Sequence, residues 1–148
     1  MTAKSGIKEN LRISSKFGKV DLLEKRLQQL AEDILTSYFE NKDVLIGIAL
    51  VDARKMRVLN RNFRGLDRAT NVLSFETPRD FPVPPKSPKL LGEVYLCPSV
   101  IKERGEDIEF LLVHGLLHLL GFDHDNSRAR MSMQKLEQKI LIWLKNRS

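Results

Sequence analysis

The three histidines of this chain fall within eleven residues, at His114, His118 and His124. The first two are four residues apart, so on a helix their imidazole rings project from one face, within reach of one ion. Gly121 can end that helix and let the chain turn back toward it. Imidazole suits zinc and related divalent ions, and three neutral histidines leave one tetrahedral position open, as in catalytic zinc sites. The pattern therefore predicts a metal centre with these three histidines as ligands.

The same residues, written HxxxHxxGxxH, match the spacing of the metzincin proteases, HExxHxxGxxH. Gly115 follows the first histidine, where those proteases carry the glutamate that acts as general base. Met131 and Met133 lie on a helical stripe and are more typical of core residues than of a Met-turn. Proteolysis is therefore disfavoured, and hydrolysis of a small amide or peptide stays an alternative that lacks its base.

Asp123 and Asp125 flank the third histidine. A metal-bound imidazole commonly donates its second N–H to a carboxylate, so either aspartate is a candidate partner, or else a cap of the turn and the last helix. Cys97 as a fourth ligand would close the site and make the metal structural. Its place in an apolar strand favours a small buried hydrophobic residue instead.

Three arginines, Arg61, Arg64 and Arg68, surround the turn at Gly65. Guanidinium groups bind phosphate through paired hydrogen bonds and stay charged, although each of these also reads as an ordinary surface arginine. The chain carries a net charge of +6 and has a pI near 9.6. This excess suggests an anionic partner, and it is spread along the chain rather than gathered in a basic tail.

The apolar pattern predicts an α+β fold of one domain over residues 1–148, with the histidine-bearing helix in the core. We expect about four strands in one mostly mixed sheet, with four or five helices. Asp21 and Glu24 look like a capping box opening the first helix, and Asp52 and Gly65 like the caps of the second. The expected helices are 21–38, 53–64, 108–120 and 127–146, and the expected strands are 44–51, 71–76, 91–97 and, more weakly, 10–14.

Two of these elements carry more specific expectations. The continuously apolar segment 44–51 is typical of a central strand that is buried on both faces. The helix after it should turn Met56, Leu59 and Phe63 inward. Five of the six prolines lie in 77–89, which reads either as a surface loop or as a mobile flap beside a site.

Several classes of protein are disfavoured by composition. No apolar run approaches the roughly twenty residues that span a membrane. The first residues contain no apolar segment of the kind found in secretory signals. One cysteine cannot form an internal disulfide, which favours a reducing, cytoplasmic setting.

Four segments together resemble the YbeY family of rRNA-maturation endoribonucleases. They are NRNFRG at 60–65, TNVLSF at 70–75, LGEV at 91–94 and HGLLHLLGFDH at 114–124. The chain has Glu93 where the family usually has aspartate, and Phe122 where it often has tyrosine. The resemblance extends from about residue 44 to residue 143.

The resemblance implies a single α+β domain that holds one zinc ion by His114, His118 and His124. It implies cleavage of single-stranded RNA, in maturation of the 3′ end of small-subunit rRNA and in ribosome quality control. Arg64 corresponds to a functionally important arginine of the family, so Arg64 and His114 are the expected catalytic residues and Arg61 and Arg68 candidate RNA contacts. The expected partners are rRNA and the small ribosomal subunit, with neither DNA nor membrane.

The mechanism that we expect rests on charge. A metal held by three histidines lowers the pKa of its water to about 7. The metal and Arg64 can together stabilise the charge on the phosphoryl oxygens. Direct attack by water and attack by the 2′-OH both remain open. The main alternative is a non-catalytic ribosome-assembly factor in which the metal only secures the last two helices.

Overall fold

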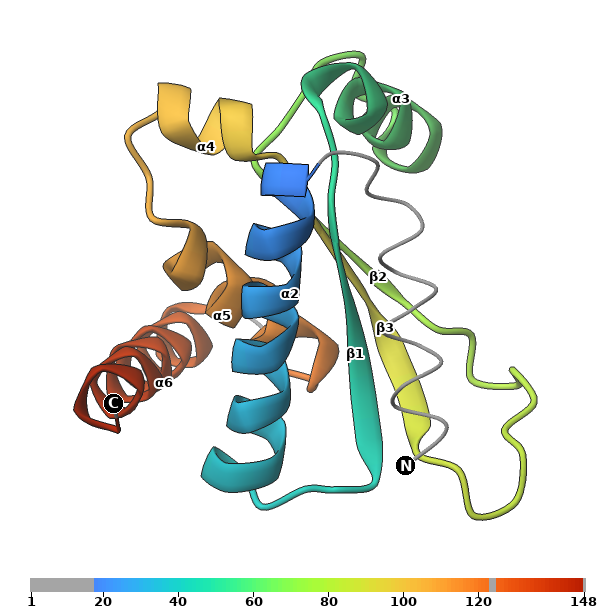
Figure 1. The fold of residues 1–148 in the computed structure, drawn as a ribbon, viewed down its shortest axis with the longest axis vertical. Coiled ribbons are helices and arrows are strands. Elements are labelled where there is room, and N and C mark those ends of the chain that lie inside the picture. Colours follow the sequence, from blue (N-terminus) through green and yellow to red (C-terminus); the bar gives the residue numbers. More distant parts are fainter. Residues whose placement is uncertain (1–17, 123–124, 148) are drawn as a thin grey trace.

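The computed structural model describes residues 18–122 and 125–147. These form helices and strands in an α+β arrangement, as the sequence predicts (Figure 1). The expected strand at 10–14 lies outside the described residues. In chain order the elements are α2 (Gly18–Asp33), the π-helical turn η1 (Ile34–Tyr38), β1 (Val44–Leu50), α3 (Ala53–Arg64), β2 (Val72–Glu76), β3 (Lys89–Leu96), α4 (Pro98–Glu103), α5 (Ile108–Leu119) and α6 (Ser127–Asn146).

The described strands form a mixed sheet in the order β1-β3-β2. β3 pairs in parallel with β1 and antiparallel with β2, so it is the central strand. The expectation that segment 44–51 is central is therefore wrong among these strands, since β1 lies on one side of the sheet. Its apolar run reports burial of both faces, which does not depend on whether a strand pairs along one edge or both.

Side chains of α2 hydrogen-bond the backbone groups along the outer edge of β1. Gln28 donates from Nε2 to the carbonyl of Ile46 at 3.1 Å, and its Oε1 accepts from the N–H of Ile48 at 3.1 Å. The N–H of Leu50 donates to Glu24 Oε2 at 2.9 Å. These bonds supply partners to buried backbone groups, as a neighbouring strand would.

The predicted capping box at the start of the first helix is wrong. α2 already includes Gly18, so Asp21 and Glu24 both lie inside the helix. Glu24 is buried against β1 and accepts a bond there instead of capping. The sequence pattern of a capping box does not distinguish an acidic residue that caps its own helix from one that accepts a hydrogen bond from a distant strand.

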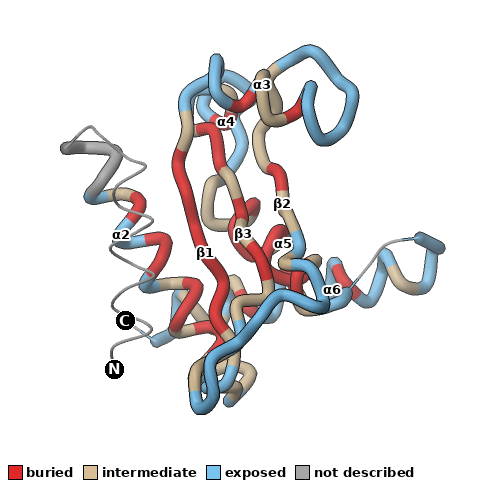
Figure 2. Tube along the Cα trace, turned by 90° about the vertical axis from the view of Figure 1, so that its right-hand side faces the viewer, coloured by how far each residue is buried: buried red, intermediate tan, exposed pale blue. Residues whose placement is uncertain are grey.

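The main core lies between the sheet and the helices α2, α5 and α6 (Figure 2). α5 is buried along most of its length, which confirms that the histidine-bearing helix runs through the core. On α6, Met133 and Ile140 face this core, with Leu136 and Trp143 partly buried against it, as expected. None of the described helices is both long and apolar enough to cross a membrane.

α3 has the caps that its sequence predicts. The Asp52 side chain accepts from the N–H of Lys55 at 2.7 Å, and Gly65 adopts the left-handed conformation with φ 73°. Its inward face differs in one position, because Phe63 is 65 % exposed. The buried polar residue is Asn60, whose Nδ2 donates to the carbonyl of Arg68 at 2.9 Å and ties the following turn to the helix.

Residues 77–88 join β2 to β3 as a loop that is mostly exposed. Two turns shape it, with Phe81 N–H bonded to the carbonyl of Pro78 and Ser87 N–H to that of Pro84. This geometry matches the surface loop that its prolines predict. Closure over a site stays a prediction.

Candidate active site

α5 brings His114 and His118 together. The helix begins after Asp107, whose side chain accepts from the N–H of Glu109, and its four-residue spacing stacks the two rings one turn apart. Their Nε2 atoms lie 3.2 Å apart. Two nitrogens bound to one tetrahedral zinc at 2.0–2.1 Å are about 3.3 Å apart. The pair therefore fits two positions of one divalent ion.

Glu137 of α6 orients the first of these rings. Its Oε2 lies 2.6 Å from Nδ1 of His114, and its side chain is 3 % exposed. A carboxylate in this position holds the proton on Nδ1, so the lone pair of Nε2 is directed toward His118. This is the tautomer that a metal ligand requires.

The sequence offered Asp123 and Asp125 as candidate carboxylate partners of a metal-bound histidine. Asp123 lies outside the described residues, and Asp125 is exposed. The cap of α6 is neither of them but Asn126, whose side chain accepts from the N–H of Ala129 at 2.8 Å. Sequence reasoning missed Glu137, although a signal was present: it follows the inward Met133 by four residues and precedes Ile140 by three.

The third predicted ligand, His124, lies outside the described residues. Within 18–122 and 125–147, no group of three His, Cys, Asp or Glu side chains is placed to hold a metal ion. Cys97 is buried with Met56 and Leu73 and lies 3.5 Å from the Ser99 hydroxyl. It packs as the small hydrophobic residue that its strand predicts, and the cavity described next does not include it.

A cavity of about 350 Å³ opens beside the histidine pair. Helix α5 contributes one wall and β2 the other, because alternate residues of β2 face the same side of the sheet. Arg64, the last residue of α3, also reaches this cavity. The structure thus brings Arg64 together with His114 and His118, which follow it by 50 and 54 residues in the sequence. The described lining residues are Arg64, Val72, Ser74, Glu76, His114, His118 and Leu119.

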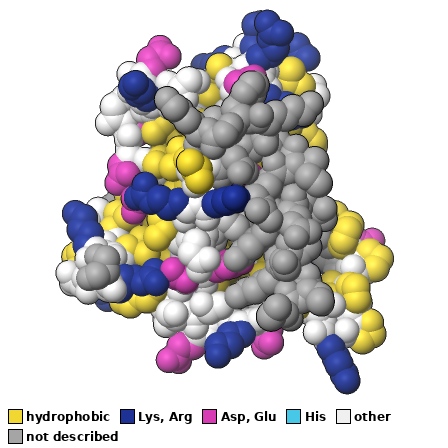
Figure 3. Space-filling view, viewed as in Figure 1, with side chains coloured by type: hydrophobic (Ala, Val, Ile, Leu, Met, Phe, Trp, Pro, Cys, Tyr) yellow, Lys and Arg dark blue, Asp and Glu magenta, His cyan; other side chains and the backbone are white. Residues whose placement is uncertain are grey.

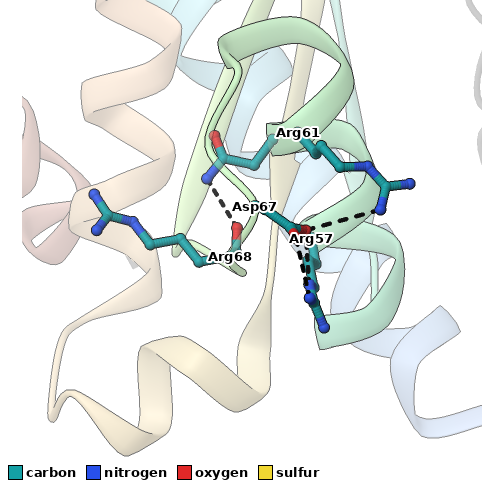
Figure 4. A network of polar contacts seen from close by, with 5 residues as sticks. Arg57, Arg61, Asp67 and Arg68 are labelled. Atoms are coloured by element: carbon teal, nitrogen blue, oxygen red, sulfur yellow. Dashed lines mark hydrogen bonds and ion pairs between the residues drawn. The ribbon is translucent and has the colours of Figure 1, made fainter.

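The other two arginines that the sequence nominated do not line this cavity. Arg57 binds Asp67 through two hydrogen bonds of 2.9 and 3.1 Å and holds the pKa of that carboxyl below its ordinary value (Figure 4). Arg61 turns to the same carboxylate at 3.8 Å. Arg68 is exposed and its side chain points away from this group. Contacts of Arg61 and Arg68 with RNA stay predictions.

Close packing of α5 on the sheet explains why residue 115 is a glycine. A Cβ at this position would lie 2.9 Å from Cγ1 of Val94 and 3.0 Å from Oγ of Ser74. α5 therefore approaches the sheet so closely that a side chain at position 115 would clash with Val94 and Ser74. This packing disfavours the glutamate of the metzincin pattern at position 115.

Glu93 lies on the sheet face opposite the histidines, since its neighbours Gly92 and Val94 face α5. It accepts a hydrogen bond from the Tyr95 hydroxyl at 3.1 Å. Burial of the phenol, together with the charge of Glu93, raises the pKa of Tyr95 to about 12. Glu93 therefore stabilises a cluster around Tyr95, away from the cavity.

Comparisons with known proteins identify the family to which the chain belongs. The model of the family described as "Endoribonuclease YbeY" matches residues 12–145. The endoribonuclease YbeY of Buchnera aphidicola subsp. Schizaphis graminum is 32 % identical over 149 residues, covering 93 % of this chain and 87 % of that protein. That of Stenotrophomonas maltophilia K279a is 42 % identical over 109 residues, covering 67 % of each. The solution structure of TM1509 from Thermotoga maritima is 28 % identical with a TM-score of 0.52, covering 88 % of this chain and 90 % of that one.

These matches first define a class: enzymes of the hydrolase type that cut RNA internally. The matched family model spans most of the chain, and the site residues of α3 and α5 lie within it. The chain belongs to the YbeY endoribonuclease family.

Proposed function

We propose that this protein is a zinc-dependent endoribonuclease specific for single-stranded RNA. One observation carries the proposal: a paired-histidine face and an arginine share one cavity of about 350 Å³. The histidine pair suits a divalent ion, and a guanidinium suits a phosphate. We propose one domain over residues 1–148, acting in the cytoplasm.

The ion would be held by His114, His118 and His124, with Glu137 fixing the tautomer of the first. A divalent ion bound there supplies a Lewis acid that polarises the phosphoryl group. Support comes from the 3.2 Å between the two Nε2 atoms and from the buried carboxylate behind one ring. Zinc is favoured because all three donors are imidazoles.

Arg64 binds the scissile phosphate in this proposal and offsets the charge that develops on its oxygens. Other basic residues hold the RNA backbone more loosely. On the face seen in Figure 3, lysine and arginine side chains stand in separate groups, one of them at the end of the molecule formed by α3. Binding of this kind weakens as salt rises.

The test uses purified protein of measured metal content, a labelled single-stranded RNA and the matching duplex. Arg64→Ala is compared with Arg54→Ala, an exposed arginine at the opposite end of α3. We expect about one metal per chain, cleavage of the single strand alone, and a loss of tenfold or more in Arg64→Ala with the control unchanged. A folded Arg64→Ala protein with full activity would show that Arg64 does not bind the scissile phosphate.

We further propose that the substrate is the 3′ end of small-subunit rRNA, with the small ribosomal subunit as partner and ribosome quality control as a second role. The support is the family resemblance of the cavity residues. Incubation with small-subunit particles carrying unprocessed rRNA, followed by mapping of the 3′ ends, tests this. Metal-loaded protein that cleaves neither naked nor particle-bound RNA would favour the assembly-factor alternative.

A further inference from the structure

We propose that Glu76 is the general base of the reaction, the group that takes the proton from the attacking hydroxyl. This rests on the RNA-cleaving function proposed above. Glu76 is the last residue of β2, and its side chain lines the cavity shared by His114, His118 and Arg64. Among the described residues that line the cavity, it is the single carboxylate.

The backbone of Glu76 is held in place on both sides. Glu76 pairs with Gly92 of β3, and the N–H of the next residue, Thr77, donates to the carbonyl of Leu91 at 2.9 Å. A Cβ on Gly92 would lie 2.2 Å from the carbonyl oxygen of Phe75, so this glycine allows the close approach of the two strands. The carboxylate therefore projects from a rigid strand end, as a reacting group requires.

No structural contact within the described residues accounts for a carboxylate at position 76. Its side chain is exposed, and within the described part of the chain no hydrogen bond or ion pair engages its carboxylate. A carboxylate beside a bound phosphate repels the substrate, which is a cost to binding. Proton transfer in the transition state is the gain that offsets this cost.

The position that carries the base in the related histidine pattern is closed in this fold. A side chain at position 115 would clash with those of Val94 and Ser74, which lie about 3 Å from where a Cβ would stand. Ser74 and Glu76 face the cavity from the same side of β2. Strand β2, which faces α5 across the cavity, thus carries the carboxylate that α5 lacks at position 115.

The same proton transfer serves either nucleophile. The attacking hydroxyl, of water or of the ribose 2′ carbon, gives its proton to the Glu76 carboxylate as its oxygen forms a bond to phosphorus. The bond from phosphorus to the leaving ribose oxygen breaks, and that oxygen takes a proton from solvent water. Glu76 then returns its proton to solvent.

The experiment compares Glu76→Gln and Glu76→Ala with Glu103→Gln, which removes an exposed carboxylate on α4. Metal content, circular dichroism and affinity for a 2′-deoxy strand of the same sequence are measured beside the cleavage rate. We expect Glu76→Gln to lose about 10²–10⁴-fold in kcat. Metal content should stay unchanged, and the deoxy strand should bind as tightly as to wild type or more tightly. Sodium formate, a small base that fits the vacated space, should restore cleavage to Glu76→Ala but not accelerate wild type.

Four results would overturn the proposal. A Glu76→Gln protein with the kcat of wild type would show that Glu76 is not the general base. Loss of metal in that variant would show that Glu76 is a metal ligand instead. Weaker binding of the deoxy strand would make it a binding residue. Failure of formate to restore Glu76→Ala would assign its effect to something other than proton transfer. Failure of the proposed function looks different, because wild type itself would then leave RNA intact.

Discussion

Replacing Glu137 by glutamine should weaken metal binding while leaving the fold intact. The carboxylate is 3 % exposed and lies 2.6 Å from Nδ1 of His114, within the range of charge-assisted hydrogen bonds. The amide of glutamine has the same shape but no charge. Its NH₂ group can also donate to Nδ1, which moves the ring proton to Nε2 and blocks the atom that faces the metal.

The size of the effect follows from that bond. A hydrogen bond to a charged group contributes about 1.5–3 kcal/mol. Loss of a carboxylate that supports a metal-bound histidine typically lowers metal affinity about 10–100-fold, or roughly 1.4–2.7 kcal/mol. The two ranges agree, so we expect the zinc dissociation constant of Glu137→Gln to rise by one to two orders of magnitude.

The assay titrates metal-free protein with zinc in competition with a chromogenic chelator. Circular dichroism and thermal unfolding check that the variant is folded, and Glu103→Gln serves as an exposed control. A folded Glu137→Gln protein that binds zinc like wild type would refute the assignment of Glu137 as the partner of a metal-bound His114.

Three further perturbations test the fold and its electrostatics. Gly115→Ala should lower the free energy of unfolding by about 1–3 kcal/mol through its clash with Val94; helix propensity alone predicts a gain of about 1 kcal/mol, so a more stable variant in urea denaturation would contradict the packing argument. Gln28→Ala leaves two buried backbone groups of β1 without a partner and should cost about 2–5 kcal/mol, whereas exposed Gln29→Ala should change the same urea midpoint little. The raised pKa of Tyr95 predicts that the contribution of this residue to stability is constant below pH 10 and falls toward pH 12, because in that window the phenol ionises only in the unfolded chain. A Tyr95→Phe protein that keeps this pH dependence would show that another group causes it.

Local signals in the sequence predicted the elements well. Asp52 and Gly65 delimit α3 because a cap depends on residues within one turn of it. The apolar segment of α5 and the periodic α6 were predicted to within one residue at their ends. Each of these signals is complete within a few neighbouring residues.

Signals that depend on distant partners failed or were ambiguous. Glu24 looked like part of a cap, yet the N–H of Leu50, twenty-six residues later, determines its role. The apolar run of β1 did not reveal that, among the described strands, β1 lies at one side of the sheet, next to β3. Phe63 follows the helical period, yet it is 65 % exposed, with its ring centroid 4.9 Å from that of Phe75 on β2.

The histidine pair was determined by the sequence alone, since a four-residue step on any α-helix places two imidazoles within reach of one ion. The tertiary structure decided what surrounds the pair. Arg64 comes from α3, Glu76 from the end of β2 and Glu137 from α6, and each meets α5 only after the helices pack on the sheet. Helical spacing is a property of the backbone, whereas the meeting of these elements depends on strand register and close packing, such as that at Gly115, which join residues far apart in the chain.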